Sequence, residues 1–231
     1  MPSIHRRDFL AASAALSGLA LSGMPAFAQA PRRGGTLRVS VDQAVAKLNP
    51  LVTRVNPEYL VAELLYSGLT RLKPDMSAEP DLAESWTNSA DLAEWTFVLR
   101  KGLTFHDGSP CTANDVVATF EAILDAKTAS PARQNVGPIA KVAAKDDATV
   151  VFSLSAPFAD LPVTLAYTNA KIVPAAVIKS GLEKLDRQAV GTGPFKLVSF
   201  EPERLIVVAR NEAFYDKERP YLDRIEVVVY P

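Results

Sequence analysis

The alternation of apolar and polar residues predicts strands near both ends of the chain and in its middle. Leu37, Val39 and Val41 alternate with polar residues, which is the period of a half-buried strand. The same pattern, or a run of branched and aromatic residues, recurs further along the chain. We predict strands at residues 36–41, 95–99, 139–143, 149–154, 195–200, 205–209 and 225–230. Lys145, Asp146 and Asp147 form the turn of a hairpin between two of them.

Helical spacing and capping residues predict helices between these strands. Asn56 is a good N-cap and Pro57 suits a first turn, so a helix is expected from about Pro57 to Tyr66. Thr112 and Asp115 stand three positions apart, as in a capping box with Asp in place of Glu. The apolar stripe of that second helix comprises Val116, Val117, Phe120, Ile123 and Leu124. Two short helices are also expected, around residue 161 and after residue 174.

Strands therefore dominate the two flanks and helices the middle. This order favours an α/β protein whose middle region is inserted into a sheet built from both flanks. Gly191, Gly193 and Pro194 make a sharp break before the last strands, and we assign them a structural role.

The first 28 residues have the pattern of an export signal. Charged residues at 5–8 precede an apolar run from Leu10 to Leu21, and Ala26 and Ala28 provide a small-residue cleavage site. Because the apolar run is too short to span a bilayer comfortably, we expect cleavage and a soluble protein in the periplasm. The pair at residues 6–7, two arginines, resembles a twin-arginine signal, although an ordinary secretory signal remains open.

The overall charge excludes one class of partner. Lys and Arg number 25 against 26 Asp and Glu, with no run of one sign. A nucleic-acid partner is not expected, since such proteins present a basic face or tail.

Enzyme chemistry has no support in the sequence. There is no G-x-S-x-G elbow, no phosphate-binding loop and no G-x-G-x-x-G after a strand. Only His106 remains once the signal is removed, so we expect no catalytic residue, no metal site and no cofactor. His106 is interpreted as a solvated turn residue, and Asp146 and Asp147 as a solvated pair. Cys111 more plausibly packs as a small apolar residue than serves as a reactive thiol.

Six aromatic residues could stack on a ligand or fill the core. We assign Trp86, Trp95 and Phe105 to the core and leave the other three open. The six are Tyr66, Trp86, Trp95, Phe105, Tyr167 and Phe195.

Several short stretches, in a fixed order, resemble one family. They are G-G-T-L at 34–37, L-N-P at 48–50, Y-S-G-L at 66–69, L-A-E-S-W at 82–86, W-T-F-V-L-R-K-G-L-T-F-H-D-G-S-P at 95–110, T-A-N-D-V-V at 112–117, V-G-T-G-P-F at 190–195 and N-E-A-F-Y at 211–215. Together they resemble the extracellular solute-binding proteins of the dipeptide, oligopeptide and nickel ABC transporter group. The resemblance covers essentially the whole chain after the signal.

The resemblance implies a periplasmic binding protein fold of type II, in which two hinged lobes close on a ligand. Residues 29–60 would begin the first lobe, residues 61–189 would form its inserted α/β subdomain, and residues 190–231 would return to the lobe. Family members are roughly twice as long. We therefore expect an incomplete first lobe and no second lobe.

The same resemblance implies a site and partners. Asn49, Tyr66, Gly68 and Leu69 would border the ligand cleft, whereas Thr112 and Asp115 would be structural. The ligand would be a peptide, or else a nickel chelate, an opine, glutathione or a short sugar. It would be delivered to the membrane permease subunits of an ABC transporter. A sensory receptor, or less plausibly an exported enzyme, is the alternative.

Overall fold

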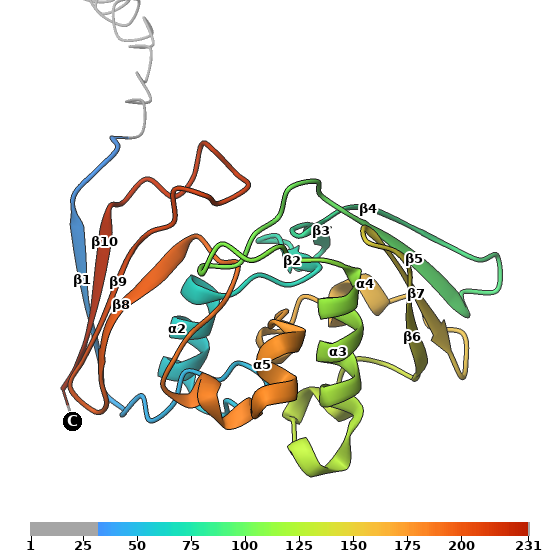
Figure 1. The fold of residues 1–231 in the computed structure, drawn as a ribbon, viewed down its shortest axis with the longest axis horizontal. Coiled ribbons are helices and arrows are strands. Elements are labelled where there is room, and N and C mark those ends of the chain that lie inside the picture. Colours follow the sequence, from blue (N-terminus) through green and yellow to red (C-terminus); the bar gives the residue numbers. More distant parts are fainter. Residues whose placement is uncertain (1–31, 231) are drawn as a thin grey trace, which may run out of the picture. The chain divides into compact units, whose positions relative to one another are not determined.

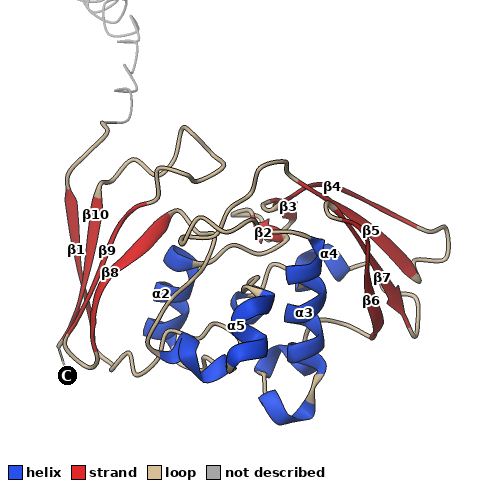
Figure 2. Cartoon of the chain, in the orientation of Figure 1, coloured by secondary structure: helices blue, strands red, loops and turns tan. Residues whose placement is uncertain are grey.

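The computed structural model describes residues 32–230, and the predicted export signal lies outside them. The strands form two four-stranded sheets and one two-stranded sheet, with helices between the larger two (Figures 1 and 2). The strands are β1 Thr36–Val41, β2 Thr70–Leu72, β3 Ala78–Pro80, β4 Ala83–Asn88, β5 Glu94–Leu99, β6 Ile139–Asp146, β7 Thr149–Leu154, β8 Phe195–Glu201, β9 Leu205–Arg210 and β10 Arg224–Val229. The helices are α2 Asn56–Leu65, α3 Ala113–Leu124, α4 Leu161–Thr164 and α5 Ala175–Ser180, with short 3-10 turns η1 Ala126–Thr128, η2 Pro131–Gln134, η3 Thr168–Ala170 and η4 Leu182–Asp186.

The first sheet joins the two flanks of the chain in the order β1-β10-β9-β8. β1 pairs with β10 in parallel, so that Leu37 lies beside Ile225 and Val39 beside Val227. The other two pairings are antiparallel. The sequence predicts all four strands to within two residues at each end, and the sheet from both flanks is confirmed.

The second sheet has the order β4-β5-β7-β6 and is antiparallel throughout. α3 packs against β6 and β7, and three phenylalanines connect the helix to the sheet. Phe97 meets Phe152 edge-on with ring centroids 5.4 Å apart, and Phe152 meets Phe120 in the same way at 5.0 Å. Aromatic pairs prefer this geometry because a positive ring edge faces a negative ring face.

Three strands escape the sequence analysis. β2 and β3 have only three residues each, too few to show a period. β4 is mostly exposed, so no row of apolar residues marks it. Trp86 on β4 is only partly buried, whereas Trp95 and Phe105 lie in the core as predicted.

The break at residues 191–194 packs against the end of α2. A Cβ atom on Gly191 would lie 2.0 Å from the Leu65 carbonyl oxygen, and one on Gly193 would lie 2.6 Å from the Tyr66 nitrogen. Real side chains cannot approach backbone atoms so closely. Glycine is therefore required at both positions by the close approach of two backbones.

His106 corrects one prediction, because its ring is partly buried and hydrogen-bonded rather than freely solvated. Its Nδ1 accepts from the Gly191 N–H at 3.4 Å, and its Nε2 lies 3.2 Å from the Gly193 carbonyl oxygen. Burial lowers the pKa of the imidazole to about 4, with Lys196 adding to the effect. His106 therefore joins the turn that follows β5 to the break before β8.

The N-terminus of α3 has the capping box that the sequence predicts. The Thr112 N–H donates to Asp115 Oδ2 at 2.8 Å, and the Thr112 hydroxyl donates to the same oxygen at 3.1 Å. The sequence does not reveal a third contact, in which Asp115 Oδ1 accepts from the Ala175 N–H at 2.8 Å. One carboxylate thus fixes α3 to the start of α5.

Two further predictions are confirmed by burial. Cys111 lies in the core, and burial raises the pKa of its thiol. Asp146 and Asp147 are both exposed. Among residues 32–230, no helix has the length and apolarity to cross a membrane.

Candidate functional site

A hollow of about 440 Å³ lies where β1 and β10 end. Both strands run in the same direction, so their carboxyl ends meet at one edge of the sheet. The Tyr230 N–H, just past β10, donates to the Val41 carbonyl oxygen at 2.9 Å and holds this edge together. The hollow is lined by Ser40, Val41, Asp42, Gln43, Asn56, Pro57, Leu60 and Tyr230.

A second hollow of about 350 Å³ lies beside the first turn of α2. Its residues come from α2, η2 and η3: Tyr59, Pro131, Ala132, Asn135, Tyr167, Thr168 and Asn169. Tyr59 lines this hollow and the next residue, Leu60, lines the first one, so the two hollows lie on neighbouring faces of α2. We call the surface formed by both hollows the carboxyl-end face.

Large apolar side chains are exposed on this face. The exposed fractions are 36% for Val55, 40% for Leu60, 46% for Tyr167 and 64% for Tyr230. Half of the large apolar residues that the described part of the chain exposes are thus at or beside the two hollows. Apolar surface gathered around a hollow is typical of binding sites.

Buried hydrogen bonds fix the loop beneath the face. Glu58 on α2 is buried and accepts from the Thr53 hydroxyl at 2.7 Å and from the Arg54 N–H at 3.4 Å. The Asn169 side-chain amide donates to the carbonyl oxygens of Pro50 and Thr53 at 2.8 and 3.1 Å. Because buried polar groups here have partners, the loop presents its side chains from a rigid base.

The structure does not bring the four predicted ligand residues together. Asn49 is buried and spans two loops, since its amide donates to the Leu182 carbonyl oxygen at 3.1 Å and its oxygen accepts from the Leu51 N–H at 3.1 Å. Leu69 is fully buried in the core. The Gly68 N–H donates to Asp81 Oδ2 at 3.0 Å. Direct ligand contact by Asn49, Gly68 and Leu69 stays a prediction.

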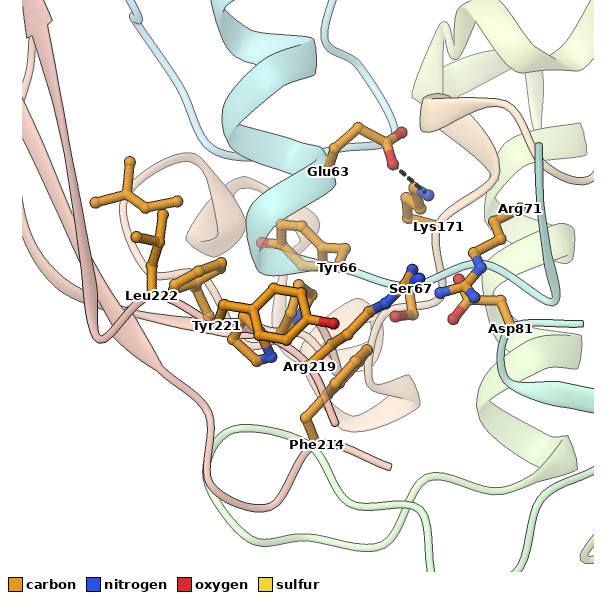
Figure 3. Close-up of a pocket in the computed structure, with 14 residues that line it drawn as sticks. Glu63, Tyr66, Ser67, Arg71, Asp81, Lys171, Phe214, Arg219, Tyr221 and Leu222 are labelled. Carbon is orange, nitrogen blue, oxygen red and sulfur yellow. Dashed lines mark ion pairs between the residues drawn. The ribbon is translucent and has the colours of Figure 1, made fainter. Parts of the chain in front are cut away.

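Tyr66, the fourth, lies at the other end of the first sheet. It contributes to the wall of a separate hollow of about 380 Å³ near the start of β8 and β10 (Figure 3). Burial raises the pKa of its hydroxyl. Whether Tyr66 contacts a transported solute also stays a prediction.

Sequence reasoning missed most residues of the carboxyl-end face. Leu60 reads as one more apolar residue of a helix, and Tyr230 as the end of a strand. One signal in the sequence could have located this face: the predicted strand that ends at Val41 is followed by a helix that starts at Asn56. Ligands in open α/β sheets gather at such ends.

The described residues contain no group of three or more His, Cys, Asp and Glu side chains that could hold a metal ion. Shape, apolar surface and a few polar groups are therefore what the carboxyl-end face offers a ligand.

The sequence is similar to those of known bacterial binding proteins. A probable D,D-dipeptide-binding periplasmic protein of Escherichia coli K12 is 34% identical over 192 residues, which are 79% of this chain and 37% of the relative. The glutathione-binding protein of the same strain is 32% identical over 188 residues, 81% of this chain and 36% of the relative. The chain therefore spans little more than a third of the length of these relatives.

Two solved structures superpose well on the described residues. The PBP AgaA from A. tumefaciens R10, in complex with agropinic acid, has a TM-score of 0.80 and 34% identity, covering 85% of this chain and 40% of its own. The murein tripeptide binding protein of Escherichia coli has a TM-score of 0.77 and 26% identity, covering 87% and 42%. The fold is thus the type II periplasmic binding protein fold, of which the described residues form part of the first lobe.

A family model matches residues 77–231, and its description is "Bacterial extracellular solute-binding proteins, family 5 Middle". This match covers more than half of the chain, and the relatives above agree with it. The chain belongs to family 5 of the bacterial extracellular solute-binding proteins.

Proposed function

We propose that this chain belongs to the substrate-binding component of an ABC transporter, and that it captures a small solute on the carboxyl-end face. The observation that carries the proposal is the position of that face. One of its two hollows lies at the carboxyl ends of the only parallel strand pair in the described residues, and exposed apolar side chains gather around both hollows. Family membership supplies the class of activity.

The solute is a peptide or a related small molecule. The relatives named above bind D,D-dipeptides, glutathione, a murein tripeptide and agropinic acid, by their names or titles. These names denote short peptides, glutathione and an organic acid, all of them small molecules. Leu60, Tyr167 and Tyr230 would pack against such a body. Asn49 and Leu69 would act by supporting the loops rather than by touching it.

Delivery of the solute to a transporter requires a second surface that encloses the solute and a compartment in which the protein meets the transporter. A solute held on one open face needs a further surface to enclose it, and hinge closure of two lobes provides that in proteins of this kind. We propose the periplasm as the location and the permease subunits of the transporter as the partner.

Replacing Arg6 and Arg7 with Lys tests the export route. Export of this variant should stop if the protein uses the twin-arginine pathway, whereas continued export indicates the ordinary secretory route.

Native mass spectrometry of the full-length protein, purified from its own host without refolding, identifies the solute that it carries. Calorimetry with that solute then tests the face. Leu60→Asp and Tyr167→Ala should each weaken binding by about tenfold or more, because each removes apolar contact worth more than about 1.4 kcal/mol.

The matched control is Met76→Asp, which changes an exposed apolar residue outside the face. Binding in this variant should equal that of the wild type. Equal losses in all three variants, or none in any, would place the solute elsewhere and refute the proposal.

A further inference from the structure

The hollow shown in Figure 3 lies at the opposite end of the first sheet from the carboxyl-end face. Ile225, at the start of β10, lines this hollow, whereas Tyr230, just past its end, lines the other one. Five residues of strand separate the two positions, a distance of roughly 17 Å. The two hollows are therefore distinct sites.

One side of this hollow is apolar. Phe214, Tyr221 and Leu222, from the segment that connects β9 to β10, and Ile225 supply most of it. Phe214 packs on Tyr215 with ring centroids 4.5 Å apart, which fixes its orientation. The volume of about 380 Å³ lies within the range of small-molecule pockets.

The opposite side carries charges that already have partners. Lys171 is buried and its Nζ lies 2.8 Å from Glu63 Oε2. Arg71 Nε donates to Glu79 at 2.7 Å. These ion pairs hold the charged side in place and leave little net charge on it.

Asp81 is likewise held, on this same side. Its Oδ2 accepts from the Gly68 N–H at 3.0 Å and its Oδ1 accepts from the Tyr215 hydroxyl at 2.7 Å. Both carboxylate oxygens are therefore occupied, so Asp81 does not need a ligand cation.

Two donors on the lining differ from these groups. Arg219 has, within the described residues, one ion pair, in which its Nε lies 4.0 Å from Asp216 Oδ2, and its side chain is 58% exposed. Figure 3 shows its side chain extending toward Ser67. Ser67 is only 3% exposed and lines the hollow, and its hydroxyl is a group that can donate to a bound carboxylate.

We propose that this hollow is a second binding site, for a small organic acid with an aromatic or branched apolar body. The Arg219 guanidinium and the Ser67 hydroxyl hold the carboxylate. Phe214, Tyr221 and Leu222 pack against the body. An arginine binds a carboxylate through charge-assisted hydrogen bonds, which distinguishes the acid from a neutral molecule of the same shape.

The probe is 3-phenylpropionate, compared with 3-phenylpropionamide, in ligand-observed NMR and calorimetry on the full chain. The acid should saturate the protein and bind about tenfold tighter than the amide, a difference of about 1.4 kcal/mol. Arg219→Met should remove this preference, and because the Arg219 side chain is 58% exposed the variant should fold like the wild type, which its melting curve checks. Phe214→Leu should weaken the acid and the amide alike, with melting curves to verify folding.

Two controls separate this site from the carboxyl-end face. Lys101→Met removes an exposed cation elsewhere and should leave binding unchanged. Leu60→Asp should also leave it unchanged, so failure of the proposed solute site does not affect this result. The proposal is overturned by equal affinities for acid and amide, by absence of saturation at millimolar probe, or by loss of probe binding in Leu60→Asp.

Discussion

The imidazole of His106 joins two distant segments through Gly193, whose carbonyl oxygen lies 3.2 Å from Nε2. The Gly191 N–H donates a hydrogen bond to Nδ1, so Nδ1 carries no proton. The proton is on Nε2, and the Nε2–H donates to the Gly193 carbonyl oxygen. A second proton on Nδ1 would face the Gly191 N–H. The neutral ring is therefore the form that the fold accommodates.

Acid should destabilise the fold through His106. Its pKa falls from about 6.5 in the unfolded chain to about 4 in the fold, mainly because of burial. Between these values the unfolded chain binds more protons, so the free energy of unfolding decreases as the pH falls from 6.5 to 4 and is unaffected by His106 above 6.5. The loss at pH 4 is on the order of 3 kcal/mol, because each pKa unit corresponds to about 1.4 kcal/mol.

The measurement is urea denaturation at several pH values, with His106→Gln as the control. Burial raises the pKa of Asp81, which therefore acts with the opposite sign in acid, but it is present in both proteins. The difference between wild type and variant isolates His106. A difference that stays constant from pH 7 to about 4 would contradict the prediction.

Gly191→Ala should be far more damaging than Gly108→Ala. The added Cβ at residue 191 would meet the Leu65 carbonyl oxygen at 2.0 Å, whereas at residue 108 it would meet open space. Gly108 has a φ of 87°, so alanine there costs about 1 to 2 kcal/mol of backbone strain. Gly191→Ala should cost more than about 3 kcal/mol or abolish folding, measured by thermal and urea denaturation. Similar melting temperatures for the two variants would disprove the close-approach argument.

Asp115→Ala should destabilise more than Thr112→Ala. Loss of the threonine cap costs about 1 kcal/mol. Loss of the carboxylate removes bonds to Thr112 and to Ala175, and should cost about 2 to 3 kcal/mol because it also frees the start of α5. Asn114→Ala, an exposed neighbour on the same turn, is the control for helix propensity. Equal costs at 112 and 115 would show that the α5 contact contributes nothing.

The Cys111 thiol should resist alkylation in the folded protein. It is 7% exposed, and burial raises its pKa, so neither access nor the reactive thiolate is available. Iodoacetamide at neutral pH should label it only after urea unfolding, as followed by intact mass. Rapid labelling of the native protein would mean that this part of the fold opens readily.

Periodicity was sufficient where one face of an element is buried. Val150, Phe152 and Leu154 form the buried face of β7, which the alternation locates, and Thr112 with Asp115 locates the start of α3. It failed where the local pattern carries no burial signal, as in β4 and the three-residue strands. Local sequence cannot show that the ring of His106 meets residues 85 positions away, so its desolvation was missed.

The candidate site was harder to predict because tertiary contacts create it. Tyr59 and Leu60 look like any other residues of a helix, and only the packing of η2, η3 and the end of β10 places hollows beside them. Tyr66 lines a hollow at the other end of the sheet, and its place beside the ligand cleft stays a prediction. Motif order indicates the family and the fold, whereas the exposed surface of each position depends on the whole chain.

The parallel pairing of β1 with β10 has a consequence for the time course of folding. Thr36 and Arg224 are partners, so 188 positions of chain separate the two strands. Closing a loop of that length costs about 4 to 5 kcal/mol of chain entropy. During synthesis, β1 must remain without its neighbour until nearly all of the described residues have been made. The inserted sheet, whose strands are closer in sequence, can form first, and the amides of β1 should exchange with solvent sooner than those of β5 and β7.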